Sequence, residues 1–298
     1  MTRIANQNWP SNQAQFITEK DFAWLKEHGV NAVRIPVGYW ILDGDGPLFS
    51  SIGKLDWAVK MAKKYGLKVL IDLHAAPGSQ NGQDHSGVIG RLDWYKHKTN
   101  RQKTIEILVR LAERYNDDDT VWGIELLNEP QFFRGGREIL KQFYQQAYDA
   151  ISKVARPGLA VVFHDGFKPY RLSGAIKPNG DLPVYMDHHW YSFVMPELFS
   201  IKLPLYFYKL RMKLDIRLTK LLCRSQPIII GEWSGVIPGP RADKMKKSER
   251  IKLVKQSISL QQKLYKDFGG WFYWNYKTES QDVWNFRSMV EGGYLKID

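Results

Sequence analysis

Two glutamates stand just after short apolar runs: Glu129 follows LL and one asparagine, and Glu232 follows III and one glycine. A carboxylate at the rim of an apolar run costs free energy unless it is paired or used. Hydrolysis of a glycoside needs two carboxyl groups beside the scissile bond, one protonated and one ionised. Either residue alone is equally consistent with a loop cap or an ordinary rim residue. Together they predict a pair for glycoside hydrolysis.

Other side chains that bind substrates also stand where predicted strands end. Tyr191 lies two residues after His189, so both share one face of a strand, where the Tyr191 hydroxyl can hold the carboxylate of Glu232. Asn128 is suited to a sugar 2-hydroxyl, and Trp274 either stacks under a sugar ring or packs in the core. The candidate substrate-binding residues are Arg34, His74, Asn128, His189, Tyr191 and Trp274.

The chain alternates short apolar runs with longer amphipathic stretches. This alternation predicts parallel strands joined by helices, and the near-continuous apolar runs are typical of strands covered on both faces. In a closed barrel of such strands, all carboxyl ends meet at one face, where active sites form. The predicted strands are 32–36, 67–73, 121–127, 159–163, 183–190, 227–233 and 270–274. The predicted helices are 18–28, 54–65, 99–116, 136–155, 197–223 and 245–267.

The fold class predicted from this order is α/β, a (β/α)8 TIM-type barrel whose first strand is missing or irregular. Seven strands are identified, and an eighth would have to precede Thr18, where residues 1–17 hold no convincing apolar run. The head of the chain then supplies an irregular strand, or an upstream segment supplies the missing one. No linker and no internal repeat interrupts the pattern, so we expect a single catalytic barrel domain over 1–298.

The composition excludes several protein classes. Of the 298 residues, 44% are hydrophobic and 25% are charged, which excludes global disorder. The single cysteine, Cys223, excludes an internal disulfide framework. No apolar run is long enough to cross a bilayer, and the first ten residues do not resemble a signal peptide. We expect a soluble monomer. The sequence does not decide its localisation, which is cytoplasmic, or extracellular if an upstream segment is missing.

The net charge of +12 favours anionic partners, and the 11 Trp, 15 Tyr and 14 Phe residues suit either bases or sugar rings. The segment 197–223 alternates Lys and Arg with Leu, Phe and Tyr. It is either a barrel helix with a solvated basic face or a segment that docks on an anionic membrane surface. Nucleic-acid binding is the weakest of these interpretations.

Metal and cofactor sites are not predicted. His188 and His189 are adjacent on a strand and point to opposite faces, so they cannot easily share an ion. His74, His85 and His164 lack a compact ligand spacing. The stretch 77–82, PGSQNG, lacks the Gly-Lys-Ser/Thr ending of a phosphate loop and is expected to be an active-site loop.

Six blocks of the chain together resemble glycoside hydrolase family 5, and most resemble its exo-β-1,3-glucanase-like branch. In order they are RIPVGYW, DLHAAPGSQNG, LLNEP, DHHWYSF, IIGEWSG and GWFYWNYKTE. The resemblance implies an eight-stranded barrel that hydrolyses β-glucosides with retention. It implies that Glu129 is the acid/base and Glu232 the nucleophile. It places Arg34, His74, Asn128, His189, Tyr191 and Trp274 at the family's other recurrent active-site positions.

The chain also departs from that branch. In that branch the first strand carries a Gly-Gly-Trp-type segment and an acidic residue, and this chain has no match for either. Gln83 stands where the branch carries an aromatic residue that packs against the next sugar. The second clamping aromatic is shifted by one near Phe193 and Val194. The alternatives are an endo-acting β-glucanase or cellulase, a glycolipid β-glucosidase of the same family, or a non-catalytic carbohydrate-binding barrel.

Overall fold

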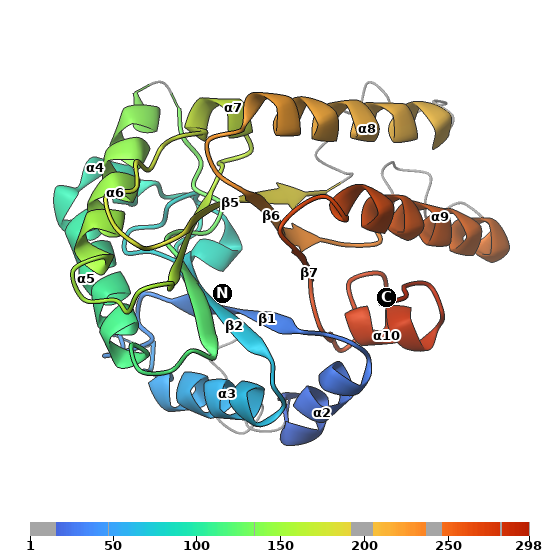
Figure 1. The fold of residues 1–298 in the computed structure, drawn as a ribbon, viewed down its shortest axis with the longest axis horizontal. Helices are drawn as coiled ribbons and strands as arrows, with labels where there is room; N and C mark the ends of the chain where they lie inside the picture. The colour runs from blue at the N-terminus through green and yellow to red at the C-terminus, as the bar shows by residue number, and fades with distance from the viewer. Residues whose placement is uncertain are drawn as a thin grey trace. The chain divides into compact units, whose positions relative to one another are not determined.

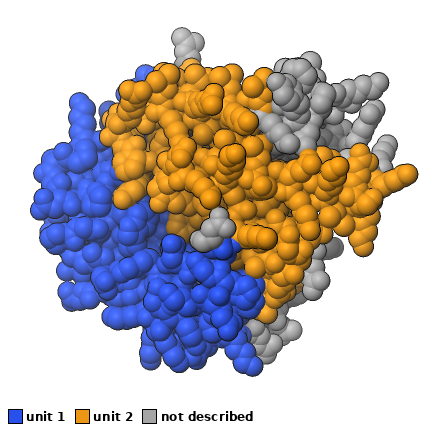
Figure 2. Space-filling view, turned by 45° about the vertical axis from the view of Figure 1, so that its right-hand side comes forward, with its two compact units in different colours: residues 1–166, 175–184, 297 blue, residues 167–174, 185–296, 298 orange. Residues whose placement is uncertain are grey.

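The structure is a computed structural model that describes residues 16–297, except 47, 134, 192–204, 237–245 and 281. The positions of the Cα atoms divide the chain into two compact units (Figure 2). The first contains residues up to Gly166 together with 175–184, and the second contains most of the chain from Tyr185 to Lys296 with 167–174.

The first unit alternates strands and helices, with its four strands in chain order and parallel to one another (Figure 1). Because the strands are parallel, their carboxyl ends meet at the same edge. Its elements are α2 (Glu19–Glu27), β1 (Ala32–Gly38), α3 (Ile52–Lys64), β2 (Lys68–Ala75), η1 (Asp84–Ser86), α4 (Asp93–Lys96), α5 (Lys98–Arg114), β3 (Val121–Glu125), α6 (Gly136–Ile151) and β4 (Ala160–His164).

The second unit repeats the alternation with three parallel strands in the order β5-β6-β7. Its elements are α7 (Pro169–Leu172), β5 (Val184–Trp190), α8 (Leu205–Leu222), β6 (Ile228–Trp233), α9 (Lys247–Tyr265), β7 (Trp271–Tyr273) and α10 (Phe286–Glu291). No described helix combines the length and apolar content needed to cross a membrane.

Local sequence accounts for where these elements begin and how they pack. The carboxylate of Asp21 accepts hydrogen bonds from the Thr18 backbone N–H at 2.8 Å and from its hydroxyl at 2.9 Å, which closes a capping box at the start of α2. All five residues of β4 and all six of β6 are buried. Burial on both faces explains why β4 and β6 begin with the continuous apolar runs 160–163 and 228–230.

All seven predicted strands are present, and every long predicted helix has a counterpart among the described residues. The predicted helix 136–155 ends at Ile151, and the chain continues in turns toward Pro157, which disfavours helical backbone before it. The short helices α4, α7 and α10 were not predicted. The position expected for an eighth strand, and Phe193 and Val194, lie outside the described residues. The single domain stays a prediction.

Candidate active site

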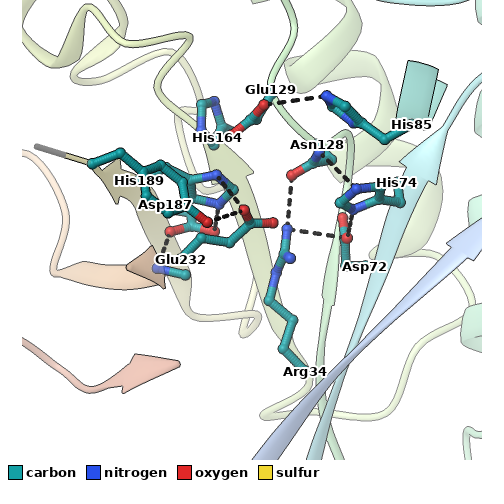
Figure 3. A network of polar contacts seen from close by, with 12 residues as sticks. Arg34, Asp72, His74, His85, Asn128, Glu129, His164, Asp187, His189 and Glu232 are labelled. Atoms are coloured by element: carbon teal, nitrogen blue, oxygen red, sulfur yellow. Dashed lines mark hydrogen bonds and ion pairs between the residues drawn. The ribbon is translucent and has the colours of Figure 1, made fainter. Parts of the chain in front are cut away.

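The first unit holds a buried charge cluster around Arg34 of β1 (Figure 3). Its Nη2 lies 3.0 Å from Oδ2 of Asp72, and its Nε donates to Oε2 of Glu125 at 2.7 Å. Asp72 and Glu125 stand opposite each other in the register of β2 and β3, and both side chains are 0% exposed. Two buried carboxylates this close would repel each other. The guanidinium between them offsets that repulsion, so all three groups form one unit.

His74 and Asn128 complete this cluster at the carboxyl ends of β2 and β3. Nδ1 of His74 lies 2.6 Å from Oδ2 of Asp72, which fixes the imidazole and favours a proton on that nitrogen. Its Nε2 then faces the Asn128 amide nitrogen at 3.4 Å. Oδ1 of Asn128 accepts from Nη2 of Arg34 at 2.9 Å. The structure therefore brings together three predicted site residues, Arg34, His74 and Asn128.

Glu129 is held by its backbone as well as by its side chain. It adopts φ of +42°, a left-handed conformation that is uncommon for a residue with a Cβ and is often found at functional sites. The amide of Asn81 donates to its carbonyl oxygen at 3.1 Å. Gln80, which is fully buried, donates to the carbonyl oxygens of His74 at 2.8 Å and Asn128 at 2.9 Å. The loop 77–82 thus positions the backbone beside Glu129.

The side chain of Glu129 meets a histidine that we did not predict. Nε2 of His85, in η1, lies 3.5 Å from Oε2 of Glu129. The Glu129 side chain is 16% exposed and the His85 side chain 30% exposed, so both reach solvent. Such a position suits an acid/base group, which must exchange protons with water.

In the second unit, Glu232 lies near the carboxyl end of β6 beside two other predicted site residues. The Tyr191 hydroxyl donates to Oε2 of Glu232 at 2.8 Å, and Nδ1 of His189 lies 3.5 Å from the same oxygen. His189 and Glu232 are paired in the register of β5 and β6. Glu232 is only 4% exposed. The structure therefore brings His189, Tyr191 and Glu232 together, as the resemblance implies.

Asp187 contacts both His189 and the backbone next to Glu232 (Figure 3). Its Oδ2 lies 3.2 Å from Nε2 of His189, and its Oδ1 accepts from the backbone N–H of Gly231 at 2.5 Å. Gly231 precedes Glu232, and a Cβ on Gly231 would lie 1.8 Å from Oδ2 of Asp187. One buried carboxylate therefore holds both the histidine and the backbone next to Glu232.

Trp274 follows β7 directly, and its backbone N–H donates to the carbonyl oxygen of Trp233 at 2.8 Å. It is partly exposed, whereas Trp233 is fully buried and packs against Trp271 with ring centroids 5.2 Å apart. Core packing at this end of the unit is thus supplied by other aromatic residues. The platform role of Trp274 stays a prediction.

The carboxylates that orient the two histidines were missed by the sequence analysis. A repeated signal was available: Asp72 precedes His74 by two residues, and Asp187 precedes His189 by two. Residues two apart on a strand share a face, so each Asp-x-His sequence predicts an aspartate beside a histidine.

Comparisons with known proteins agree with this chemistry. Residues 2–280 match the family model described as cellulase (glycosyl hydrolase family 5). A probable glucan 1,3-beta-glucosidase A of Aspergillus terreus is 34% identical over 93% of this chain and 74% of its own length. A glucan 1,3-beta-glucosidase of Blumeria graminis is 31% identical over 99% of this chain and 75% of its own.

Solved structures establish the fold. A rutinosidase from Aspergillus niger superposes with a TM-score of 0.77 at 19% identity, covering 96% of this chain and 84% of its own. An endo-glycoceramidase II from Rhodococcus sp. gives 0.66 at 16% identity, covering 90% and 70%. The fold is therefore an α/β barrel of the (β/α)8 type, to which the described residues contribute seven strands. On the match of the family model and these relatives, the chain is a glycosyl hydrolase and belongs to glycosyl hydrolase family 5.

Proposed function

We propose that this chain hydrolyses β-glucosidic bonds of a glucan of the 1,3-linked type and retains the configuration at the anomeric carbon. The observation that carries the proposal is the setting of Glu232, a buried carboxylate oriented through one oxygen by Tyr191 and His189. A carboxylate so positioned suits nucleophilic attack. The names of the relatives, which cover 93–99% of this chain, support the glucan as substrate.

The reaction proceeds in two displacements. In the first, a carboxylate oxygen of Glu232 forms a bond to the anomeric carbon, and Glu129 transfers its proton to the departing glycosidic oxygen. In the second, Glu129 takes a proton from water, the water oxygen attacks the same carbon, and the bond to Glu232 breaks. Retention by this route requires the two carboxyl groups to stand about 5–5.5 Å apart.

The neighbouring residues contribute position and charge. Tyr191 and His189 restrict rotation of the Glu232 carboxylate, so less entropy is lost when the attack geometry forms. Asn128, whose oxygen accepts from Arg34 and whose amide nitrogen faces His74, remains our candidate for binding a sugar 2-hydroxyl. His74, locked by Asp72, presents its Nε2 beside that amide.

The nucleophile is tested with Glu232→Gln, which preserves shape and removes the charge. We expect turnover of an aryl β-glucoside to fall by at least about 10⁴-fold while binding of a glucan oligosaccharide stays within about threefold. The matched control is Glu106→Gln, which removes a charge from the exposed face of α5 and should leave turnover unchanged. Substantial activity in the Glu232 variant would refute its role.

The acid/base is tested with Glu129→Ala. An aryl glycoside with an activated leaving group needs no proton in the first step, so this substrate should lose far less activity than a glucan. Azide should restore turnover by replacing water in the second step, and it should not rescue Glu232→Gln. If azide rescues neither variant and activated substrates lose as much as glucans, Glu129 is not the acid/base.

Substrate class and stereochemistry are measured directly. Proton NMR of the earliest product should show the β-anomer, and an initial α-anomer would contradict double displacement. Hydrolysis rates on β-1,3-linked oligosaccharides, β-1,4-linked oligosaccharides and a glucosylated ceramide separate the proposed substrate from the cellulase and glycolipid alternatives. Binding of these ligands without hydrolysis would refute the proposed reaction and favour the alternative of a non-catalytic carbohydrate-binding barrel.

A further inference from the structure

Helix α8 exposes leucines along the side that faces away from its packed side. Its packed side carries Met212, Ile216 and Thr219, all buried, and the buried Cys223 follows the helix directly. At about 100° per residue, Leu210, Leu214 and Leu221 fall on the opposite side of the helix, and Leu218 and Leu222 extend the row along one flank. Their exposed fractions are 50% for Leu210, 53% for Leu214, 42% for Leu218, 55% for Leu221 and 56% for Leu222.

This arrangement departs from what a helix on a protein surface normally shows. A helix that buries one stripe usually has charged and polar residues on the other side. Single exposed leucines are ordinary, whereas a contiguous row marks an interaction surface. Among the described elements α8 contacts α7 and α9 (Figure 1). The leucines stay 42–56% exposed beside these neighbours.

Basic side chains border one edge of the row. On the helical wheel Lys213 and Arg217 lie between the leucines and the packed side, and both are exposed. Arg224, also exposed, follows two residues after the end of the helix. Two other charges of this helix are neutralised: Arg211 lies 3.4 Å from Asp215, and Lys220 lies 2.7 Å from Asp267. The surface therefore combines an apolar row with a positive edge for which no ion pair is found among the residues that the structure describes.

We propose that this face of α8 docks on an anionic phospholipid bilayer, lying in the plane of its surface. The leucines enter the boundary between headgroups and acyl chains, while Lys213, Arg217 and Arg224 contact lipid phosphates. Membrane affinity of this kind requires both apolar area and positive charge, and α8 offers both. The helix of 18 residues is about 27 Å long, which suits a helix lying along the surface.

Two partners could cover the leucine row of α8, a bilayer or a second copy of this chain, and the charge of the row's edge favours the bilayer. A second copy would place the same positive edge against the first, and the whole chain carries +12. Like charges brought together at an interface oppose association, whereas an anionic membrane attracts them. A bilayer therefore offers an apolar environment to the leucines and negative charge to the basic edge at the same time.

The test is co-sedimentation of the full chain with vesicles of phosphatidylcholine alone or with about 30% phosphatidylserine. We expect at least about tenfold tighter binding to the anionic vesicles, weakening as salt is added. Leu214→Ser with Leu218→Ser and Leu221→Ser should lower this binding at least about tenfold without changing the charge. Circular dichroism verifies folding. Absence of binding by the unmodified chain at low salt overturns the proposal.

Two controls separate a specific face from general basicity. Lys213→Gln, Arg217→Gln and Arg224→Gln should weaken binding, whereas the same charge removed by Lys54→Gln, Lys60→Gln and Lys153→Gln, all exposed, should not. Equal losses in both triple variants would mean that net charge alone binds the vesicles. A dimer in light scattering that the leucine variant dissociates would assign the row to a second copy instead.

A site-specific label reports which face enters the lipid. In a Cys223→Ser background, Leu214→Cys or Lys153→Cys is labelled with a polarity-sensitive fluorophore. The label at position 214 should shift to shorter wavelength on anionic vesicles, and the label at position 153 should not. No shift at position 214, or equal shifts at both positions, would refute docking through α8.

Discussion

Substitution of Gly231 by alanine tests the link between Asp187 and Glu232. The added Cβ would stand 1.8 Å from Oδ2 of Asp187, whereas ordinary contacts begin near 3.4 Å. The carboxylate or the strand must therefore move by about 1.6 Å. Because Asp187 also contacts His189, and His189 faces the Glu232 carboxylate, the displacement passes to the proposed nucleophile.

The expected size follows from these contacts. Overpacking of a close-packed site costs about 1–3 kcal/mol, and a weakened hydrogen bond to a charged group costs about 1.5–3 kcal/mol. We expect Gly231→Ala to lower the free energy of unfolding by about 3 kcal/mol, which lowers the Tm by about 5–10 °C. A displacement of about 1 Å at Glu232 should reduce kcat/KM for an aryl β-glucoside about 100-fold.

A double-mutant cycle with Asp187→Ala identifies the cause. Once the aspartate side chain is gone, the clash is gone, so Gly231→Ala should cost less than about 1 kcal/mol in that background. Gly53→Ala in α3, where no atom lies within 4 Å of the added Cβ, is the control and should be neutral or stabilising. Unchanged stability and activity in Gly231→Ala, or an equal cost with and without Asp187, would refute this reasoning.

Three further substitutions probe each cluster. Tyr191→Phe removes the hydroxyl that orients the proposed nucleophile and should lower kcat about 10–100-fold in steady-state assays. Asp72→Asn leaves Arg34 buried without one of its charge partners and should cost about 3–5 kcal/mol in urea unfolding. The hydrogen bond from Arg114 lowers the pKa of Asp56 below its value in the unfolded chain. The pair therefore stabilises the fold at a pH above the unfolded pKa, and this stabilisation is lost as the pH falls through the folded pKa. Since the two side chains are 41% and 37% exposed, Asp56→Asn should cost under about 1 kcal/mol at neutral pH, and urea unfolding should show no difference in strong acid.

The strands and the long helices could be predicted from the sequence because their signals are local. A strand buried on both faces must be apolar throughout, and a helix that packs on it must repeat its apolar residues at 3.6-residue spacing. The short helices α4 and α7 span four residues each, which is too short for any periodicity to be recognised.

The order of the elements and the residue types at the strand ends, including Glu129 and Glu232, follow from the amino-acid sequence. The contacts between particular oxygen and nitrogen atoms depend on how the strands align in the folded chain. His189 faces Glu232, and Asp72 stands opposite Glu125, because of the register between neighbouring strands. A slip of one residue would turn each side chain to the other face, and nothing within a single strand specifies that alignment.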